Sequence, residues 1–426
     1  MPGARIGPIE PSTDPVLDAM SLLNEIAARF PDAVSLAPGW PPDDQFAIGD
    51  VDRYLRRYAD YLSAERGMSA DAVRRQVFQY GPSAGTIREL VVRFLARAEG
   101  IEADPRAVVM TTGCQEAMVV VLRALCAGPS DVLLVPSPCY FGVVGAAKIL
   151  GIPVHPVPER ASGLEPDDVV DAVRELRAAG RRPRALYVVP DFANPSGHTL
   201  TRATRDRLRG VAAEQGLLIL EDSPYRFFSR FDRRLPTLKS SDVDRSVVFL
   251  GSFSKICFPG ARVGFVVADQ EAGPAGLLAE QLTRIKSMVT VNTSPLAQAV
   301  VGGMLLADDF ALLEANAARI ATVNRRMETL LGELHRHFGP LRARHPELDW
   351  TEPDGGFFVA LRLPFVADLA ALEDSAARFG VLWTPMSLFY QGGGERQIRL
   401  AASYATPEEI ARGVRRLAGF VVDRLS

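Results

Sequence analysis

The segment VVFLGSFSKICFPGARVG, residues 247–264, places a scarce lysine directly behind an apolar run. The first four residues are typical of a strand that is covered on both faces. Lys255 follows two serines, Ser252 and Ser254, and Arg262 lies seven residues beyond it; the chain has only four lysines. A lysine that loses its hydration in a crevice becomes a nucleophilic amine, and the serines and the arginine can bind a phosphate.

The same order of apolar run, loop and helical stretch extends on both sides of this segment, from about residue 107 to residue 267. Strands of a parallel sheet are apolar on both faces when helices cover both sides of the sheet. Seven runs have this character, namely residues 107–110, 132–135, 153–157, 186–189, 217–220, 247–250 and 263–267. We therefore expect an α/β fold whose large domain contains a mostly parallel, seven-stranded sheet.

The flanking sequence predicts a smaller α+β domain that is built from both ends of the chain. Long helical stretches after residue 268 lead into predicted strands at 356–363, 381–383 and 398–400. Thr406, Pro407 and Glu409 carry the signature of a capping box at the start of the last helix. We predict a large domain at residues 47–305 and a small domain from residues 1–46 and 306–426.

The composition argues against several kinds of partner. A net charge of −3 over 426 residues gives no electrostatic reason to bind nucleic acid or an anionic membrane. The four cysteines form no C-x-x-C pair, so we expect a reducing, cytoplasmic environment. The first residues lack the apolar core of a signal peptide, and no apolar run is long enough to span a bilayer. No metal site is expected.

Polar residues follow four other predicted strands, at the edge where an open parallel sheet binds ligands. Gly113, with Cys114 and Gln115, opens a helix whose free N–H groups can bind a phosphate, although a plain strand-to-helix turn has the same pattern. Tyr140 follows the next strand, where its ring could stack on a planar cofactor or simply cover the core.

Asn194 and Asp222 follow two further strands. Asn194 lies in the turn Asn194-Pro195-Ser196-Gly197, where its amide could donate to a cofactor oxygen or serve the turn alone. Asp222 comes directly after a buried strand, so its carboxylate needs a cationic or hydrogen-bonding partner. A protonated heterocycle would be such a partner; the alternative is an aspartate that caps the next helix.

These motifs together resemble the fold-type I pyridoxal-phosphate (PLP) enzymes, specifically the class I/II aminotransferases. The resemblance is strongest to the branch that contains aminoadipate and kynurenine aminotransferases, and it runs from about residue 35 to residue 417. Its most specific parts are Asn194-Pro195-Ser196-Gly197, Asp222-Ser223-Pro224-Tyr225, and Ser252-Phe253-Ser254-Lys255 with Arg262. The resemblance implies PLP as cofactor, and an α-amino acid and a 2-oxo acid as substrates.

The resemblance also implies a role for each residue at the strand ends. Lys255 would form the Schiff base with the cofactor and later shuttle a proton, and Asp222 would keep the pyridine nitrogen protonated. Asn194 and Tyr225 would bind the phenolic oxygen, and Tyr140 would stack on the ring. The phosphate would be held by Gly113, Cys114, Gln115, Ser252, Ser254 and Arg262.

Three more positions match the family outside the sheet. Gly39, in Ser35-Leu36-Ala37-Pro38-Gly39, would contact the substrate carboxylate together with Asn194. Arg399 would grip that carboxylate bidentately, although without the family an ion pair on a small-domain strand would be the simpler interpretation. Tyr80 would reach the phosphate in the neighbouring subunit, which implies a homodimer with shared active sites.

The sequence departs from the family pattern at a few places that bear on the substrate. Trp40 follows Gly39, and Ile256-Cys257-Phe258 after the lysine is bulkier than usual, so both can shape the substrate pocket. Residues 17–25, where aminoadipate-type enzymes can place an arginine, contain none, which argues against a dicarboxylic substrate. The tyrosine-rich stretch 54–79 reads as an amphipathic helix or as a lid.

Two functions remain open at this level. Transamination is the first, and another PLP reaction on an amino acid, such as elimination, oxidation or cyclisation, is the alternative. A regulator with a winged-helix module is set aside because no basic helical module precedes the domain. The sequence around Asn194 and around Cys114 resembles that of aminotransferases of antibiotic pathways that make non-proteinogenic amino acids, of the dihydroxyphenylglycine or enduracididine type.

Overall fold

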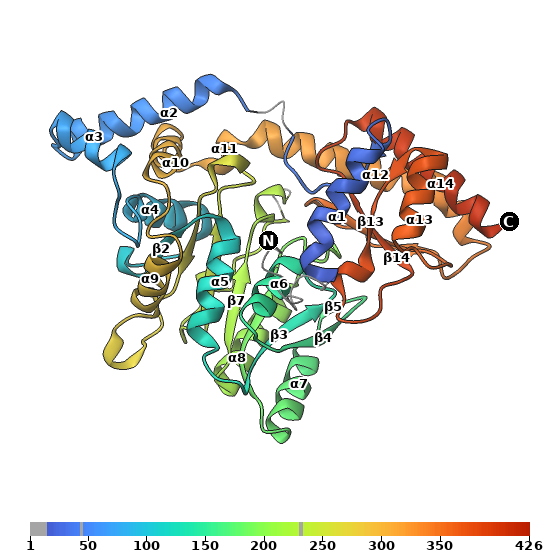
Figure 1. Ribbon diagram of the computed structural model, residues 1–426, viewed down its shortest axis with the longest axis horizontal. Helices are drawn as coiled ribbons and strands as arrows, with labels where there is room; N and C mark the ends of the chain where they lie inside the picture. The colour runs from blue at the N-terminus through green and yellow to red at the C-terminus, as the bar shows by residue number, and fades with distance from the viewer. Residues whose placement is uncertain (1–14, 43–45, 230–232) are drawn as a thin grey trace, which may run out of the picture.

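The computed structural model describes residues 15–42, 46–229 and 233–426, with the side chains of part of the first helix left out. The expectation of no signal peptide falls on residues 1–14, outside the described residues. Within the described ranges, no helix is both long and apolar enough to cross a membrane. The chain is α/β and is organised around one large sheet (Figure 1).

The large sheet has eight strands in the order β2-β9-β8-β7-β6-β3-β4-β5. β9 runs antiparallel to both of its neighbours, β5 pairs antiparallel with β4, and the other neighbours are parallel. The seven predicted strands are all present, and the two-residue β5 is added at one edge. The strands are β2 Val108–Thr111, β3 Asp131–Ser137, β4 Val154–Arg160, β5 Gly163–Leu164, β6 Arg182–Val188, β7 Leu218–Asp222, β8 Val247–Ser252 and β9 Gly264–Val267.

Helices cover both faces of this sheet because the strands are apolar on both sides. Along β3, Leu133 and Val135 join a core cluster with side chains of α5 and α6, whereas Val132 and Leu134 join another with side chains of α7 and α8. Successive side chains of a strand point to opposite faces, which explains this alternation. The helices are α4 Arg88–Glu99, α5 Gly113–Leu125, α6 Phe141–Ile149, α7 Pro166–Ala178, α8 Arg202–Gln215 and α9 Leu278–Val289.

A separate core cluster joins the two ends of the chain. Ile26, Val34 and Leu36 pack with side chains of residues 327–421, and Figure 1 shows α1 beside the C-terminal elements. Its sheet has the order β10-β11-β14-β13, and β1 pairs with β12. The elements are α1 Pro15–Arg29, β1 Val34–Ser35, α12 Ala317–Arg342, β10 Asp349–Trp350, β11 Phe358–Arg362, α13 Leu369–Asp374, β12 Val381–Leu382, β13 Thr384–Pro385, β14 Gln397–Ala401 and α14 Pro407–Leu425.

The three predicted C-terminal strands correspond to β11, β12 and β14, whereas the two-residue strands β1, β10 and β13 were not predicted. The capping box is confirmed: the Thr406 side chain accepts from the Glu409 N–H, and the Glu409 side chain accepts from the Thr406 N–H. This arrangement satisfies two N–H groups that the first turn of α14 would otherwise leave unpaired.

The tyrosine-rich stretch forms α2 Ile48–Asp60, a π-helical turn at Tyr61–Glu65, and α3 Ala70–Phe78. Figure 1 shows α2 and α3 along the upper left edge of the molecule. α2 packs on α10 Pro295–Ala307, so closely that a Cβ on Gly303 would lie 1.7 Å from the Tyr54 carbonyl oxygen. A short helix, α11 Leu312–Ala315, follows α10. One face of α2 is therefore packed, as expected of an amphipathic helix.

Candidate active site

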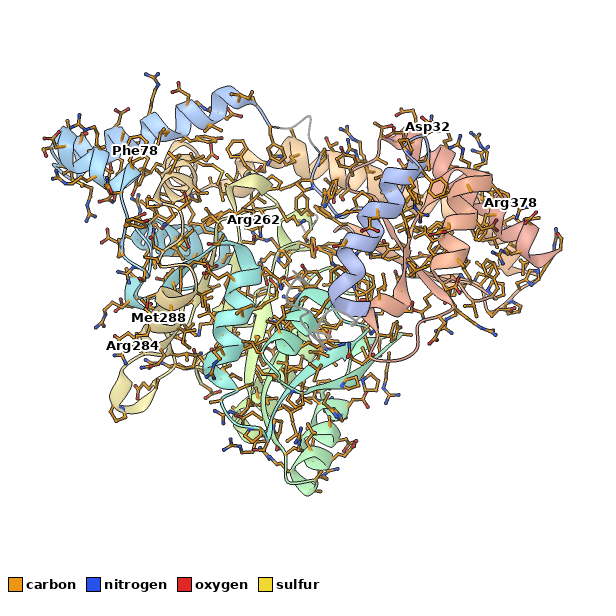
Figure 2. All side chains as sticks on the ribbon, in the orientation of Figure 1. Asp32, Phe78, Arg262, Arg284, Met288 and Arg378 are labelled. Carbon is orange, nitrogen blue, oxygen red and sulfur yellow. The ribbon has the colours of Figure 1, made fainter. Side chains whose placement is uncertain are left out.

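The carboxyl ends of the strands bring the predicted residues to one edge of the large sheet. Asp222 is the last residue of β7 and pairs in register with Leu250 of β8, so Lys255, which follows β8, lies nearby. Gly113 begins α5 directly behind β2, and Tyr140 precedes α6 behind β3. Figure 2 labels Arg262 near the centre of the molecule.

Asp222 has one satisfied and one unsatisfied carboxylate oxygen. Its Oδ2 accepts a hydrogen bond of 2.7 Å from the Tyr187 hydroxyl, while Oδ1 is buried and has no partner within the described part of the chain. Burial raises the pKa of Asp222 to about 6, against the opposing effects of Tyr187 and other neighbours. A buried oxygen without a donor is costly, so this position fits a cationic N–H group. Asp222 caps no helix.

Lys255 differs from two of the other lysines in its surroundings. Lys239 is paired with Asp242 and Asp269, and Lys286 with Glu116. Lys255 makes no ion pair with any described residue; its Nζ donates to the Gly39 carbonyl at 2.8 Å.

The Lys255 Nζ also lies 5.8 Å and 5.7 Å from the ring centroids of Tyr225 and Phe357. Burial, followed by the charges of Arg262 and Arg399, lowers the pKa of Lys255 to about 8. Its amine is therefore neutral in a larger fraction of molecules near neutral pH than an exposed lysine, as a nucleophile requires.

The start of α5 forms an anion-binding turn. Gly113 has φ +73°, and a Cβ there would lie 2.4 Å from Arg262 Nη2, so only glycine leaves the space in front of the helix open. Arg262 itself adopts φ +51° and donates to Ser254 Oγ at 3.2 Å. Ser252 Oγ in turn accepts from the Ser254 N–H at 3.2 Å. A helix N-terminus, an arginine and two hydroxyls suit a phosphate.

Tyr140 and Gln115 both pack against Gly142. The Gln115 amide donates to the Gly142 carbonyl at 2.8 Å, and a Cβ on Gly142 would lie 2.3 Å from the Tyr140 ring. Burial raises the pKa of Tyr140 to about 12, so its phenol stays neutral. The Cys114 thiol donates to the Gly251 carbonyl at 3.3 Å, and it also lies close enough to Asp222 to lower the pKa of that carboxyl.

Arg399 projects from β14 toward the same edge of the large sheet. Its Nη1 donates to Asn194 Oδ1 at 2.8 Å and its Nη2 to the Ala37 carbonyl at 2.8 Å. The guanidinium carbon lies 4.4 Å and 4.9 Å from the ring centroids of Phe358 and Phe389. Burial lowers the pKa of Arg399 to about 10, so the group stays cationic at neutral pH. It is a buried cation and makes no surface ion pair with the described residues.

Asn194, Tyr225 and Gly39 complete this side of the site. Burial raises the pKa of Tyr225, and the neighbouring Asn194 side chain opposes this rise. A Cβ on Gly39 would lie 2.4 Å from the Phe358 ring, so the backbone can pass between that ring and Lys255 only as glycine. The structure therefore brings together every predicted residue except one.

Tyr80 is the exception. It lies just beyond α3 and is 85% exposed, and within the described ranges no hydrogen bond or ring contact joins it to the other predicted residues. Phe78, two residues earlier, is labelled at the left edge of the molecule in Figure 2, whereas Arg262 lies near the centre. The phosphate role predicted for Tyr80 is therefore not available within its own subunit.

Sequence reasoning missed Tyr187, Phe358 and Phe389. Tyr187 holds Asp222, and the two phenylalanines enclose the guanidinium of Arg399. A tyrosine in the buried apolar half of strand β6, residues 185–188, was a usable signal, because a buried hydroxyl needs a partner. The phenylalanines carried no such signal, since they look like ordinary core residues.

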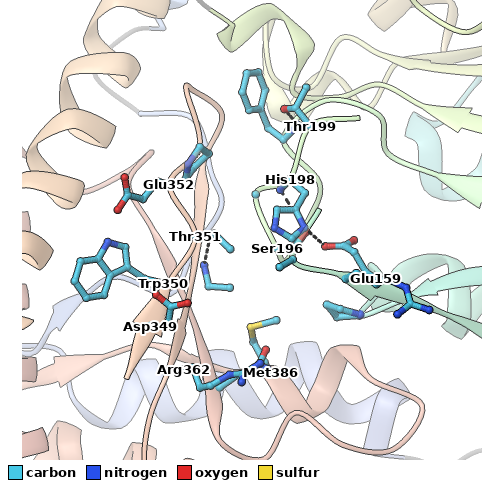
Figure 3. Close-up of a pocket in the computed structure, with 18 of the residues that line it drawn as sticks. Glu159, Ser196, His198, Thr199, Asp349, Trp350, Thr351, Glu352, Arg362 and Met386 are labelled. Atoms are coloured by element: carbon cyan, nitrogen blue, oxygen red, sulfur yellow. Dashed lines mark hydrogen bonds and ion pairs between the residues drawn. The ribbon is translucent and has the colours of Figure 1, made fainter. Parts of the chain in front are cut away.

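A cavity of about 760 Å³ lies beside this site (Figure 3). Its lining includes Ser196, His198, Glu159, Trp350 and Arg362 but not Lys255. The His198 ring contacts Glu159, which raises the pKa of His198. Ser196 and His198 follow Asn194 in one loop, and Asn194 accepts from Arg399, so this loop borders both the cavity and the site.

A buried lysine of lowered pKa, a carboxylate with an unpaired buried oxygen in the described structure, and a glycine-opened helix N-terminus define a PLP-dependent transferase of fold type I. These residues fit the cofactor. The unpaired oxygen of Asp222 suits its protonated ring nitrogen, and the space that Gly113 leaves at the start of α5 suits its phosphate. The chain belongs to the aminotransferase class I and II family, whose model matches residues 56–417.

Similar proteins are aminotransferases as well. The chain is 46% identical to (S)-3,5-dihydroxyphenylglycine transaminase of Amycolatopsis orientalis, over 97% of this chain and 93% of the relative. It is 32% identical to 2-aminoadipate transaminase of Thermus thermophilus, over 91% and 89%. A solved α-aminoadipate aminotransferase of Thermus thermophilus, complexed with N-(5'-phosphopyridoxyl)-L-leucine, superposes with a TM-score of 0.77 at 28% identity, over 98% of each chain.

The predicted family, branch and fold class are thereby confirmed. The protein is a transaminase, its cofactor is pyridoxal phosphate, and its substrates are amino acids and oxo acids.

Proposed function

We propose that this aminotransferase transfers the amino group between an amino acid of the arylglycine class, such as a dihydroxyphenylglycine, and a 2-oxo acid. The observation that carries the proposal is the 46% identity, along almost the whole chain, to a dihydroxyphenylglycine transaminase. Arg29, the first arginine after residues 17–25, pairs with Glu373. This pairing supports a substrate without a second carboxylate.

We assign the chemistry to a small set of residues. Lys255 would hold PLP through a Schiff base to its aldehyde carbon, with release of water, and once a substrate amine displaced it, the free Lys255 amine would carry the proton to and from the substrate Cα. The Asp222 carboxylate holds a proton on the ring nitrogen through its unpaired Oδ1. Tyr225 and Asn194 donate to the phenolic oxygen. PLP, when bound, supplies the electron sink for the carbanion at Cα.

The remaining residues bind and orient. Arg399 and Gly39 hold the substrate carboxylate, and Tyr140 stacks against the ring. Gly113, Gln115, Ser252, Ser254 and Arg262 hold the phosphate, with the Cys114 thiol facing inward to the Gly251 carbonyl.

The assembly is proposed as a cytoplasmic homodimer. Tyr80 is exposed on its own subunit, together with Ile48 and Phe78 at 93% and 66% exposure. A second copy would cover these apolar groups and bring Tyr80 to the partner's phosphate site. Residues 47–305 would be the large domain, and residues 1–46 with 306–426 the small one. Sedimentation of the purified protein tests the dimer, and a monomer with full activity would contradict it.

A donor panel tests the function. Purified enzyme is assayed with 3,5-dihydroxyphenylglycine, phenylglycine, 2-aminoadipate, kynurenine and the guanidino amino acid enduracididine, each with 2-oxoglutarate and pyruvate as acceptors. We expect kcat/KM to be highest for the arylglycines. Highest efficiency with 2-aminoadipate or enduracididine, or release of ammonia without an acceptor, would overturn the proposal.

A further inference from the structure

Two aromatic rings, Trp40 and Tyr404, meet because two backbone segments that carry residues of the site run side by side. The segment that carries β1 is joined to β12 through the Leu36 N–H and the Leu382 carbonyl at 2.9 Å. The Ala401 N–H, at the end of β14, donates to the Leu36 carbonyl at 2.7 Å. Trp40 and Tyr404 lie a few residues beyond these bonds, and their rings meet edge to face at 5.9 Å and 88°.

Both rings are placed by the residues of the site itself. Trp40 follows Gly39, whose carbonyl accepts from Lys255 Nζ at 2.8 Å. Tyr404 follows Arg399 by five residues, and Arg326 donates to the Ser403 and Tyr404 carbonyls at 2.7 Å and 3.2 Å. Arg326 therefore fixes the turn that carries Tyr404. The pair lies close in the chain to Gly39, which contacts Lys255, and to Arg399, which is assigned to the substrate carboxylate.

Both rings of this pair are exposed to solvent. Trp40 is 51% exposed and Tyr404 37%, whereas the other two tryptophans, Trp350 and Trp383, are buried. A T-shaped pair presents ring faces and edges to a third ring, and aromatic contacts of this kind stabilise a complex beyond their buried area. Apolar surface at the edge of a ligand site marks a contact with the ligand.

We infer that Trp40 and Tyr404 form the subsite for the substrate side chain and select an aryl group as a third ring against the pair. The inference rests on the proposed function and adds the residues that determine its specificity. An aliphatic or carboxylate side chain gains little from this surface, since it has no ring to stack and a carboxylate would lose hydration there.

The first test compares donors rather than variants alone. The ratio of kcat/KM for phenylglycine to that for alanine is measured in the wild type, Trp40→Leu, Trp40→Phe and Tyr404→Leu. We expect Trp40→Leu and Tyr404→Leu to lower the ratio by roughly tenfold, mainly through KM for phenylglycine, and Trp40→Phe to recover most of it. Phe365→Leu is the matched control, because it breaks another T-shaped pair, with Phe420 at 5.8 Å, in the small-domain cluster.

The second test does not use turnover. Phenylacetate is titrated into the holoenzyme while tryptophan fluorescence is followed, with propionate as the aliphatic comparison. Phenylacetate should change the emission saturably and more tightly than propionate, and Trp40→Phe should remove the signal, because the other two tryptophans are buried.

The outcomes separate the two proposals. If the wild type transaminates no arylglycine, the proposed function is wrong. A wild type that prefers arylglycines while Trp40→Leu keeps the donor ratio overturns this inference alone. Equal phenylacetate and propionate affinities, or a signal that survives in Trp40→Phe, overturn it as well.

Discussion

The floor of the site and its rim are built by different parts of the fold. The floor, with Asp222 and Lys255, stands on the ends of adjacent parallel strands, where burial shifts both pKa values. The rim, with Trp40 and Tyr404, stands on segments outside the large sheet and stays exposed. The sheet fixes the groups that every donor needs, whereas the segments that leave it present the surfaces that distinguish one donor from another.

The largest expected effect is the loss of the floor's amine. Lys255→Ala should reduce turnover to background and abolish the visible absorption of lysine-bound PLP, because the other three lysines lie elsewhere in the fold. Lys148→Ala should retain both properties. Borohydride reduction of the wild type followed by peptide mapping should place the cofactor on Lys255; a label on Lys148, Lys239 or Lys286 would refute the assignment.

The next effect concerns the charge opposite the ring nitrogen. Asp222→Asn should still bind PLP but lose roughly a thousandfold in kcat, because a neutral amide does not keep that nitrogen protonated and the developing carbanion loses stabilisation. Asp222→Glu should lose less. Single-turnover rates with a fixed donor provide the measurement. A kcat of Asp222→Asn within a few-fold of the wild-type value would show that Asp222 has no part in the mechanism.

Arg399 links the floor to the rim and should give a smaller loss. Arg399→Lys should lower kcat/KM by roughly a hundredfold for every α-amino acid donor, because a lysine ammonium cannot reproduce the bidentate fork. The donor ratio of phenylglycine to alanine should stay near that of the wild type, in contrast to Trp40→Leu. A loss confined to arylglycines would show that Arg399 acts on the side chain and not on the carboxylate.

The floor was the predictable half of the site. Residues 217–220 and 247–250 are continuous apolar runs, so the polar residues that follow these runs, Asp222 and Ser252 to Lys255, could be assigned to one sheet edge from the sequence alone. The same argument predicted the seven main strands. The two-residue strands β1, β10 and β13 could not be found, because two residues show no periodicity.

Only one half of the rim was predictable: the sequence singled out Trp40 beside Gly39, but not its contact with Tyr404. Trp40 and Tyr404 are far apart in the sequence and meet only because backbone bonds join Leu36 to Leu382 and Ala401. The enclosure of Arg399 by two phenylalanine rings, one from β11 and one from the segment before β14, is equally non-local. Sequence patterns identify residues that are unusual in their own neighbourhood, and a phenylalanine near a strand is not unusual.

Without the cofactor, the buried charge of Asp222 should destabilise the folded protein. Asp222 has its pKa raised from 3.8 to about 6 by burial, so its charged form is disfavoured in the folded state. This penalty is fully present above about pH 6 and disappears as pH falls toward 4. Cofactor-free Asp222→Asn should therefore be more stable than cofactor-free wild type at pH 7.5, by roughly 2–3 kcal/mol from a shift of about two pH units.

Chemical unfolding of both cofactor-free proteins between pH 7.5 and pH 5 measures this difference. The gain should shrink as the pH is lowered, since protonated Asp222 carries no penalty. A gain that is constant across this range, or a loss at pH 7.5, would mean that burial of the Asp222 charge is not what destabilises the empty site.

The smallest expected effect lies away from both floor and rim, at the capping box of α14. Thr406→Ala removes the acceptor for the Glu409 N–H and should lower the free energy of unfolding by about 1 kcal/mol. In a chain of this size the change corresponds to roughly 1–2 °C in Tm. Glu408→Ala, next to the box but outside it, should have less effect.

Both variants should keep the visible absorption of bound PLP and the donor ratio of the wild type, because the large sheet holds the floor and β12 holds the segment that carries Trp40. A Thr406→Ala variant that lost its aryl preference without losing stability would show instead that the rim depends on the start of α14, two residues beyond Tyr404, and the separation of floor from rim would have to include that helix.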